Sequence, residues 1–267
     1  MILVFTFAAI SVALLWEMLM PRRQLKQSLA WRWSNNFALS LISQSIATAA
    51  SAAIVIGLSN WTQVNEFGLF QRVAAPAPLV FLVLLLATQL VLYLMHIAYH
   101  RYTWLWPIHA VHHTDVDVDV TTSYRHHPLE ALIAVTLISP LVLLLGIPTD
   151  VAIAYSLFLV AVTLFSHSNI RMPRSLEKLL RPFIVTPEFH RLHHCSDPRF
   201  TNSNYGPVVP WFDYLFGTAS TRPYEDHETM ELGLEYLREP ADSRVDKLLW
   251  EPVLVRKLLA AGEERRR

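Results

Sequence analysis

The sequence has a single cysteine, Cys195, among its 267 residues. An internal disulfide is therefore excluded, and the chain fits a reducing compartment. Charged residues are also scarce, at 16% against about a quarter in soluble domains, while apolar residues reach 53%. The formal net charge is zero, so the charge balance gives no support to nucleic-acid binding.

The apolar residues are concentrated in runs of membrane-spanning length. The strongest run, 78–95, is long enough to cross most of the hydrocarbon core. Two earlier candidates are 1–20 and 36–58, and the first lacks the basic start and small-residue end of a secretory signal. The shorter runs 129–147 and 151–165 predict two more spans, or a re-entrant or interfacial hairpin. We expect an all-α integral membrane bundle of four to five membrane helices.

Basic residues predict the orientation of this bundle in the membrane. Four of them follow the first run, at Arg22, Arg23, Lys26 and Arg32. Only Arg72 lies between the second and third runs, none lies in the turn 146–150, and fifteen follow residue 167. Placing the basic segments in the cytosol gives an outside N-terminus and a cytosolic C-terminus. The histidines described next then share the cytosolic side.

Histidines gather in three clusters with helical spacing. The clusters are His96-x-x-x-His100, His109-x-x-His112-His113 and His190-x-x-His193-His194. Spacings of three and four residues put imidazoles on one face of a helix. A lone histidine is usually structural, but every buried ring nitrogen needs a partner. Eight histidines in this pattern therefore predict a metal site.

Eight imidazoles exceed the capacity of one ion and predict two metals in a nitrogen-rich cage. The chain has no Glu-x-x-His pair, the motif of soluble di-iron bundles. Asp115, Asp117 and Asp119 alternate with valine, which is typical of an extended, solvated edge, so we do not expect them to bind metal. A di-iron centre of this kind suits O2 activation against a lipid C–H bond. Zinc or copper would bind such a site at least as tightly.

The clusters and the sequence segments between them resemble the fatty acid hydroxylase / sterol desaturase superfamily of integral-membrane di-iron oxygenases. The matching text includes Thr121-Thr-Ser-Tyr-Arg125-His-His127-Pro-Leu-Glu130, His167-Ser-Asn169, Thr186-Pro-Glu-Phe-His190, Asn204-Tyr-Gly206 and Asp213-Tyr-Leu-Phe-Gly-Thr218. Phe212 stands where the family usually has Trp, and His126 adds a histidine beside the expected His127. The resemblance implies a catalytic domain at 77–218, preceded by N-terminal membrane helices at 1–76 and followed by a polar tail at 219–267. The histidine-rich part would cap the bundle on the cytosolic side.

The resemblance also implies the metal ligands. The catalytic set is His96, His100, His109, His112, His113, His190, His193 and His194. His127 and His167 would be the ninth and tenth metal ligands. Alternatively, His127 caps a helix that starts at Pro128, and His167 is an interfacial histidine that closes the fifth run.

The implied activity is that of an O2-dependent di-iron monooxygenase or desaturase, acting on a sterol or fatty-acyl lipid in lipid biosynthesis. Its cofactors would be two iron ions (Fe2+/Fe3+), with O2 as co-substrate. Electrons would come from a separate electron-transfer protein, because the chain has no haem or flavin signature. The rival readings are a related carotenoid hydroxylase, a histidine-rich metal transporter and an inactive scaffold of the same fold. Transport sites tend to lie near the bilayer midplane on broken helices, whereas these histidines lie at and beyond helix ends.

Other residues receive structural interpretations. We expect Arg125 and Glu130 to form an ion pair that supports the cluster, and Asn169 to orient a ligand. Cys195 should be a small buried group, and His227 should be solvated.

Three further segments are predicted to lie at the surface of the protein. Tyr102, Trp104 and Trp106 predict an interfacial aromatic belt. The run 176–183 predicts a short amphipathic helix, which either rests in the headgroup layer or packs on the protein. The segment 245–267 predicts a polar helix that ends as a solvated tail.

Overall fold

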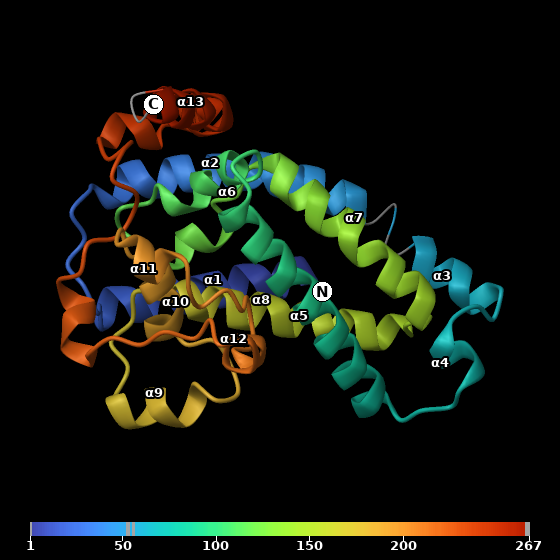
Figure 1. Cartoon of the computed structure of the whole chain (residues 1–267). Coiled ribbons are helices and arrows are strands. Elements are labelled where there is room, and N and C mark those ends of the chain that lie inside the picture. Colours follow the sequence, from blue (N-terminus) through green and yellow to red (C-terminus); the bar gives the residue numbers. More distant parts are fainter. Residues whose placement is uncertain (1, 52–53, 55–56, 265–267) are drawn as a thin grey trace.

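The computed structural model describes residues 2–51, 54 and 57–264, and within these the chain is helical, without strands (Figure 1). The all-α prediction is confirmed. The long helices are α1 (Ile2–Leu19), α2 (Leu29–Ser51), α5 (Ala77–Arg101), α7 (Pro128–Leu145), α8 (Thr149–His167) and α13 (Val245–Glu264). The short helices are α3 (Gly57–Val64), α4 (Leu69–Arg72), α6 (Trp106–His113), α9 (Arg174–Leu180), α10 (Pro187–His193), α11 (Pro198–Thr201) and α12 (Trp211–Phe216). Three 3-10 helices complete the set: η2 (Val120–Tyr124), η3 (Tyr224–Glu228) and η4 (Pro240–Ser243).

Three of the described helices, α5, α7 and α8, are long and apolar enough to cross a membrane. The chain is therefore a membrane protein, although the described residues do not reach the predicted four or five spans. Helix α1 is also apolar, and its stretch Val4–Leu19 is shorter than these three spans. Helix α2 starts before the predicted run 36–58 and carries Arg32 and Asn36. Residues 52, 53, 55 and 56 of that run lie outside the described residues.

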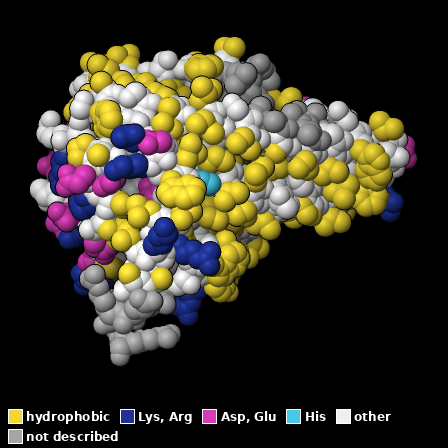
Figure 2. Space-filling model, turned by 90° about the horizontal axis from the view of Figure 1, so that it is seen from above, with side chains coloured by type: hydrophobic (Ala, Val, Ile, Leu, Met, Phe, Trp, Pro, Cys, Tyr) yellow, Lys and Arg dark blue, Asp and Glu magenta, His cyan; other side chains and the backbone are white. Residues whose placement is uncertain are grey.

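The long helices run side by side and bring the histidines to one end. Helix α1 packs along α8 and α2 along α7, while α5 contacts both α7 and α8. Short helices α6 and α10 meet the long ones at the end away from α3 and α4 (Figure 1). In Figure 2 most charged side chains gather at the histidine end, and hydrophobic side chains cover the part that extends toward α3 and α4. This polarity is what a membrane-embedded bundle with a polar cap requires.

Helix α13 packs on the short helix α6. Leu248 and Val255 of α13 are fully buried, and they contact Val111 and Ala110 of α6. The prediction of a solvated tail is therefore wrong for residues 245–264. The hydrophobic face of α13 is paired with a helix that carries three of the histidines.

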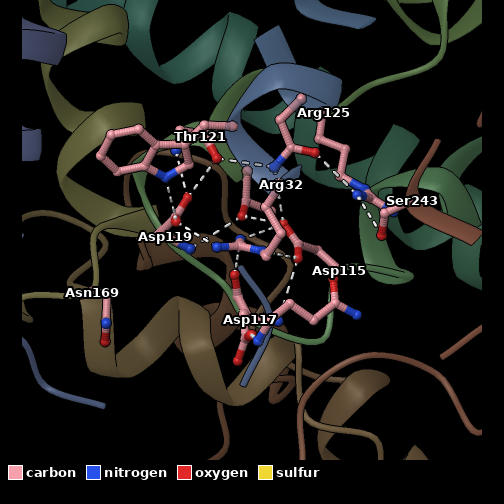
Figure 3. Close-up of polar contacts among 12 residues, drawn as sticks. Arg32, Asp115, Asp117, Asp119, Thr121, Arg125, Asn169 and Ser243 are labelled. Atoms are coloured by element: carbon pink, nitrogen blue, oxygen red, sulfur yellow. Dashed lines mark hydrogen bonds and ion pairs between the residues drawn. The ribbon is translucent and has the colours of Figure 1, made fainter. Parts of the chain in front are cut away.

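A buried ionic cluster ties α2 to the loop between α6 and η2 (Figure 3). The Arg32 guanidinium is fully buried and pairs with Asp115 at 2.9 Å and Asp119 at 2.6 Å. Asp117 accepts hydrogen bonds from the backbone N–H groups of Lys26 and Gln27, at 2.8 and 2.7 Å. Burial alone would raise the pKa of Asp115, but Arg32 and Arg125 outweigh it and hold the pKa at about 2. The predicted solvated edge is thus wrong, because these aspartates are buried anions with a cation between them.

Arg125 lies beside this cluster and does not pair with Glu130. Its guanidinium donates to the Val111 carbonyl at 2.9 Å, to Asn36 Oδ1 at 3.0 Å and to Ser243 Oγ at 3.4 Å. The predicted Arg125–Glu130 ion pair is therefore wrong. Arg125 instead joins α2, α6 and η4, three segments that are far apart in the sequence.

Replacing Arg32 with Met should destabilise the protein, because Asp115 and Asp119 would remain buried without their cation. Breaking a buried ion pair from one side costs about 3–5 kcal/mol. We expect the Tm of the detergent-purified protein to fall by roughly 10 °C, measured by intrinsic fluorescence. The matched control is Arg244→Met, an exposed arginine, which should leave the Tm within about 2 °C. Equal Tm values for the two variants would contradict the structural role of Arg32.

Candidate metal centre

Nine of the ten predicted ligands converge into two adjacent groups. The first group is His96, His100, His109, His113 and His193; the second is His112, His167, His190 and His194. Within each group the potential ligand nitrogens lie within 4.8 Å of one another. The groups adjoin, since the His194 ring centroid is 4.7 Å from that of His113 and 4.5 Å from that of His112.

Helices α6 and α10 each serve both groups. In α6, His109 and His113 are one turn apart and enter the first group, while His112 is rotated into the second. In α10 the pattern is the same, with His193 in the first group and His190 and the C-cap residue His194 in the second. The His-x-x-His-His spacing therefore divides its histidines between two neighbouring sites.

Backbone carbonyls hold the outer nitrogens of three rings. Nδ1 of His96 lies 2.7 Å from the Tyr205 carbonyl, Nδ1 of His193 lies 2.7 Å from the Ser203 carbonyl, and Nδ1 of His167 lies 2.8 Å from the Thr163 carbonyl. A carbonyl oxygen only accepts, so Nδ1 must carry the proton in each ring. The Nε2 atom of each neutral ring is then a bare lone pair that faces the centre of its group. This is the usual outer support of metal-binding histidines.

His96 and His109 show the consequence most clearly. Nδ1 of His109 lies 3.0 Å from a carboxylate oxygen of Glu130, so it too carries a proton. The two Nε2 atoms lie 3.0 Å apart, and in neutral rings both are bare. Two facing lone pairs repel each other unless a cation is shared between them. Nε2 of His100 and of His193 are also buried without a hydrogen-bond partner, so the first group fits a metal ion.

The second group repeats this geometry. Nε2 of His167 lies 2.9 Å from Nε2 of His190 and 3.3 Å from Nε2 of His112. Nε2 of His194 lies 3.2 Å from that of His190. One ring nitrogen can donate to only one of these close neighbours, so hydrogen bonding alone leaves the set unsatisfied. The donor set of this group also fits a metal ion.

The electrostatic environment keeps these rings neutral. Burial, followed by the neighbouring histidines, lowers the pKa of His112, His113, His190, His193 and His194 well below the ordinary value. A neutral imidazole offers its lone pair to a metal, whereas a protonated one cannot. The fold therefore presents these histidines in the form that ligation requires.

His127, predicted as the ninth ligand, lies in neither group. Its Nδ1 accepts a hydrogen bond from the Leu129 N–H at 3.2 Å and caps α7, and its Nε2 donates to the Leu249 carbonyl at 3.3 Å. This is the capping alternative considered for it. The neighbouring His126 is closer to the site, with its ring stacked on His112 at 4.3 Å.

Glu130, which was predicted to pair with Arg125, instead contacts two histidines at the site. One of its oxygens lies 3.0 Å from Nδ1 of His109 and 3.0 Å from Nδ1 of His126. The signal was available in the sequence, because His126 and Glu130 are spaced by four residues at the start of α7.

The turn after α11 positions the carbonyl that holds His96. Both carboxylate oxygens of Asp213 accept from backbone N–H groups, of Tyr205 at 2.8 Å and of Gly206 at 2.7 Å. A Cβ on Gly206 would meet the Val209 carbonyl oxygen at 2.4 Å, so only glycine fits there. Phe212, the departure from the family pattern, packs against Tyr93 with centroids 5.9 Å apart. Through these contacts, the Asn-Tyr-Gly and Asp-Tyr-Leu-Phe-Gly segments position the Tyr205 carbonyl that holds His96.

A second ionic cluster supports α10 from outside. Glu188 pairs with Arg22 at 3.0 Å, with Arg191 at 2.7 Å and with His227 at 3.0 Å. His227 is buried, so the prediction that it is solvated is wrong. Asn169 holds the segment after α1, accepting from the Arg23 N–H at 3.0 Å and donating to the Arg23 carbonyl at 2.9 Å.

Other surface predictions have mixed outcomes. Cys195 is a buried small group, as predicted. Tyr102 and Trp104 are exposed, which fits an aromatic belt. Trp106 is instead half-buried, donates to Tyr236 Oη at 3.1 Å and lies with its ring centroid 5.0 Å from that of His100. Trp106 therefore lines the first histidine group.

Comparisons with known proteins point to one family. The sequence profile described as "Fatty acid hydroxylase" matches residues 81–218, which contain all the clustered histidines. The chain is 25% identical to the ornithine lipid hydroxylase OlsE of Rhizobium tropici over 221 residues, which are 81% of this chain and 66% of that protein. It is 29% identical to the human alkylglycerol monooxygenase over 127 residues, 47% of this chain and 27% of that protein. It is 30% identical to Protein CER1-like 2 of Arabidopsis thaliana over 140 residues, 49% of this chain and 22% of that protein.

The chain thus spans about two thirds of the length of the first relative and about a quarter of the other two. No solved structure matches it.

Replacing Glu130 with Gln should weaken metal binding. The neutral amide cannot offer His109 and His126 the same charged acceptor, so the His109 ring is held less firmly. Losing such an outer partner typically lowers metal affinity about 10–100-fold. The measurement is metal retained per chain during titration with a chelator. Glu235→Gln, at an exposed site, is the control, and identical retention curves for both variants would show that Glu130 does not support the site.

Proposed function

Since this chain belongs to the fatty acid hydroxylase family, we propose that it is a membrane-bound oxidoreductase that uses O2 to hydroxylate or desaturate a C–H bond of a lipid. The observation that carries the proposal is the pair of histidine groups with opposed bare nitrogens, of which His96 and His109 at 3.0 Å are the clearest case. The site lies at the ends of the apolar helices α5 and α8, and we propose that a lipid carbon approaches it from the bilayer.

The proposed cofactor is a pair of iron ions, one for each histidine group. The ligands would be the nine clustered histidines, with His127 left as a helix cap. Imidazole suits iron as well as zinc or copper, so the choice of iron rests on the family. Bound iron would supply activation of O2 for attack on an unactivated C–H bond.

The protein's own contribution is to preorganise the donors and keep water out. The carbonyls of Thr163, Ser203 and Tyr205 hold three rings in one tautomer, so no reorientation is needed when metal binds. All nine histidines lie in the protein interior or at its margin, which favours a dry site for a reactive oxidant. Electrons would come from a separate protein on the cytosolic side.

The names of the relatives favour a lipid substrate. Two of them are named as a hydroxylase and a monooxygenase of lipid-type compounds, an ornithine lipid and an alkylglycerol. We propose oxidation of an acyl or related lipid chain, with a sterol as the other candidate. A metal transporter is disfavoured, because the histidine groups are formed at helix ends and by the short helices α6 and α10.

We also propose a multi-pass topology with the histidine site and the C-terminus in the cytosol. Residues 1–76 would supply membrane helices and 77–218 the catalytic domain. Residues 219–267 would form a cytosolic segment that covers α6 and α10 rather than a free tail, since η3 and α13 pack on them.

The central test compares His112→Asn with His127→Asn. Wild-type protein should contain close to two iron atoms per chain and oxidise lipid when supplied with O2 and an electron donor. His112→Asn should lose metal from the second group and all oxidation. His127→Asn should keep both, because asparagine is also a good helix cap.

The readouts are metal analysis and mass spectrometry of the lipid extract. A gain of one oxygen would indicate hydroxylation, and a loss of two hydrogens would indicate desaturation. One metal or none per wild-type chain would refute the two-metal reading, and full activity of His112→Asn would remove that residue from the site.

The proposed orientation predicts that a reporter fused after Arg267 is cytosolic. A reporter placed between α3 and α4, at the end of the bundle away from α6 and α10 (Figure 1), should be external. Paired fusions with a cytosol-active and an exported-only reporter measure both positions. External labelling of the C-terminal fusion would overturn the topology while leaving the metal site untouched.

A further inference from the structure

A surface pocket lies beside α9, outside the two histidine groups. The pocket has a volume of about 220 Å³ and is formed by α9, α12 and the chain around η3. Four basic side chains line it: Arg174, Lys178, Arg181 and Arg222. The aromatic residues Tyr214 and Tyr224 also line it, together with Pro182, Pro223 and His227. The pocket is thus a cationic hollow with aromatic sides.

The positive charge of this pocket is only partly compensated. The acidic residue in the lining, Glu177, is buried and already accepts from Arg181 Nε at 2.5 Å and from Thr186 at 3.0 Å. Arg174 and Arg222 pair with exposed Glu225 and Asp226 at 3.6 and 3.2 Å, and exposed pairs of this kind contribute little. Lys178 forms no ion pair with any described residue. An anion that enters would meet cations available to bind it.

The position of the pocket along the membrane normal follows from the contact between α12 and α5. Phe216 of α12 stacks on Tyr93 of α5, with ring centroids 5.7 Å apart and an interplanar angle of 20°. Tyr93 lies about 24 Å along α5 from Ala77, at ~1.5 Å per residue. The hydrocarbon core is about 30 Å thick. If α5 spans the membrane as proposed, with the core beginning at Ala77, Tyr93 lies in the last ~6 Å of the core and α12 lies close to the headgroups.

Exposed hydrophobic side chains lie on the same two segments that form the pocket, outside its lining. Leu179 and Phe183, in and after α9, are 64% and 62% exposed, and Leu215 and Phe216 of α12 are 69% and 55% exposed. The two segments are held together by a hydrogen bond of 2.8 Å from Trp211 Nε1 to the Pro182 carbonyl. Helix α9, predicted from the sequence as amphipathic, therefore exposes its apolar side chains on one face and turns its basic ones to the pocket on the other. Such a surface is suited to the membrane interface, with apolar groups in the acyl layer and cations among the headgroups.

We propose that this pocket binds the phosphate of an anionic phospholipid in the cytosolic leaflet. Arg174, Lys178 and Arg181 would contact the phosphate, while Leu179, Phe183 and Leu215 enter the acyl layer around it. The bound lipid would fix α9 and α12 at the interface and hold the loop Asn204–Gly206, which supports His96, at a constant depth. The lipid is a structural ligand and is separate from the oxidised substrate.

The test measures lipid retention by the full-length protein and so does not depend on oxidation. Protein purified in neutral detergent is mixed with equal amounts of phosphatidylglycerol and phosphatidylcholine, and the retained lipids are counted by native mass spectrometry. Wild type should favour phosphatidylglycerol by about tenfold, because its headgroup has a net negative charge that the basic residues attract, whereas phosphatidylcholine is zwitterionic. Arg174→Glu/Lys178→Glu should lose this preference. Arg174→Lys/Lys178→Arg should keep it.

The matched control is Arg244→Glu/Lys247→Glu, which makes the same change in charge at exposed residues far from the pocket. It should retain the wild-type preference and show that the pocket, and not the total charge, selects the lipid. Gel filtration of each variant checks that the fold is intact. Equal retention of the two lipids by wild type, an equal loss in the control, or displacement of the lipid by excess inorganic phosphate would each overturn the assignment.

Discussion

The structure depends on one electrostatic constraint, the presence of nine imidazoles whose inner nitrogens point at one another. Nε2 atoms of His96 and His109, or of His167 and His190, lie about as close as hydrogen-bonded atoms. In neutral rings, the carbonyls and the carboxylate behind His96, His109 and His167 prevent the inner nitrogens of those rings from donating. Without a shared cation the arrangement is repulsive, so the rest of the fold must hold it in place. A cation converts the same geometry into a source of stability.

That restraint comes from segments far outside the histidine-rich text. Arg32 of α2 joins the loop after α6 to the N-terminal region through two buried aspartates. Glu188 in α10 is joined to Arg22 and to His227, so segments from both the N-terminal and the C-terminal parts of the chain contact the same short helix. Helix α13 closes over α6 through Leu248 and Val255. Buried ion pairs are a costly way to hold a helix, but they fix its position with the directional precision that a ligand set needs.

The sequence predicts the parts of this arrangement that are local. Helical spacing correctly brings His109 and His113 together, and apolar run length locates α5, α7 and α8. Most of the failures involve partners that are distant in the chain. Asp115 and Asp119 look solvated until Arg32, more than eighty residues earlier, is seen between them. His227 and the residues of α13 were likewise expected to be exposed to solvent, because their partners, Glu188 and α6, lie far away in the sequence. The choice between adjacent His126 and His127 depends on the turn that starts α7, where one ring caps the helix and the other faces Glu130.

These contacts also bear on what counts as the catalytic unit. The family profile matches residues 81–218, yet the helices that carry the ligands are packed against residues on both sides of that range. His96 is held by Tyr205 and His109 by Glu130, within the match, but α6 is covered by α13 and its following loop is neutralised from α2. The matched region therefore contains the histidines of both groups, but only some of the residues that hold these histidines in position. Relatives that share only this region would need other segments to supply the same restraint, because the repulsion among the imidazoles is a property of the site itself.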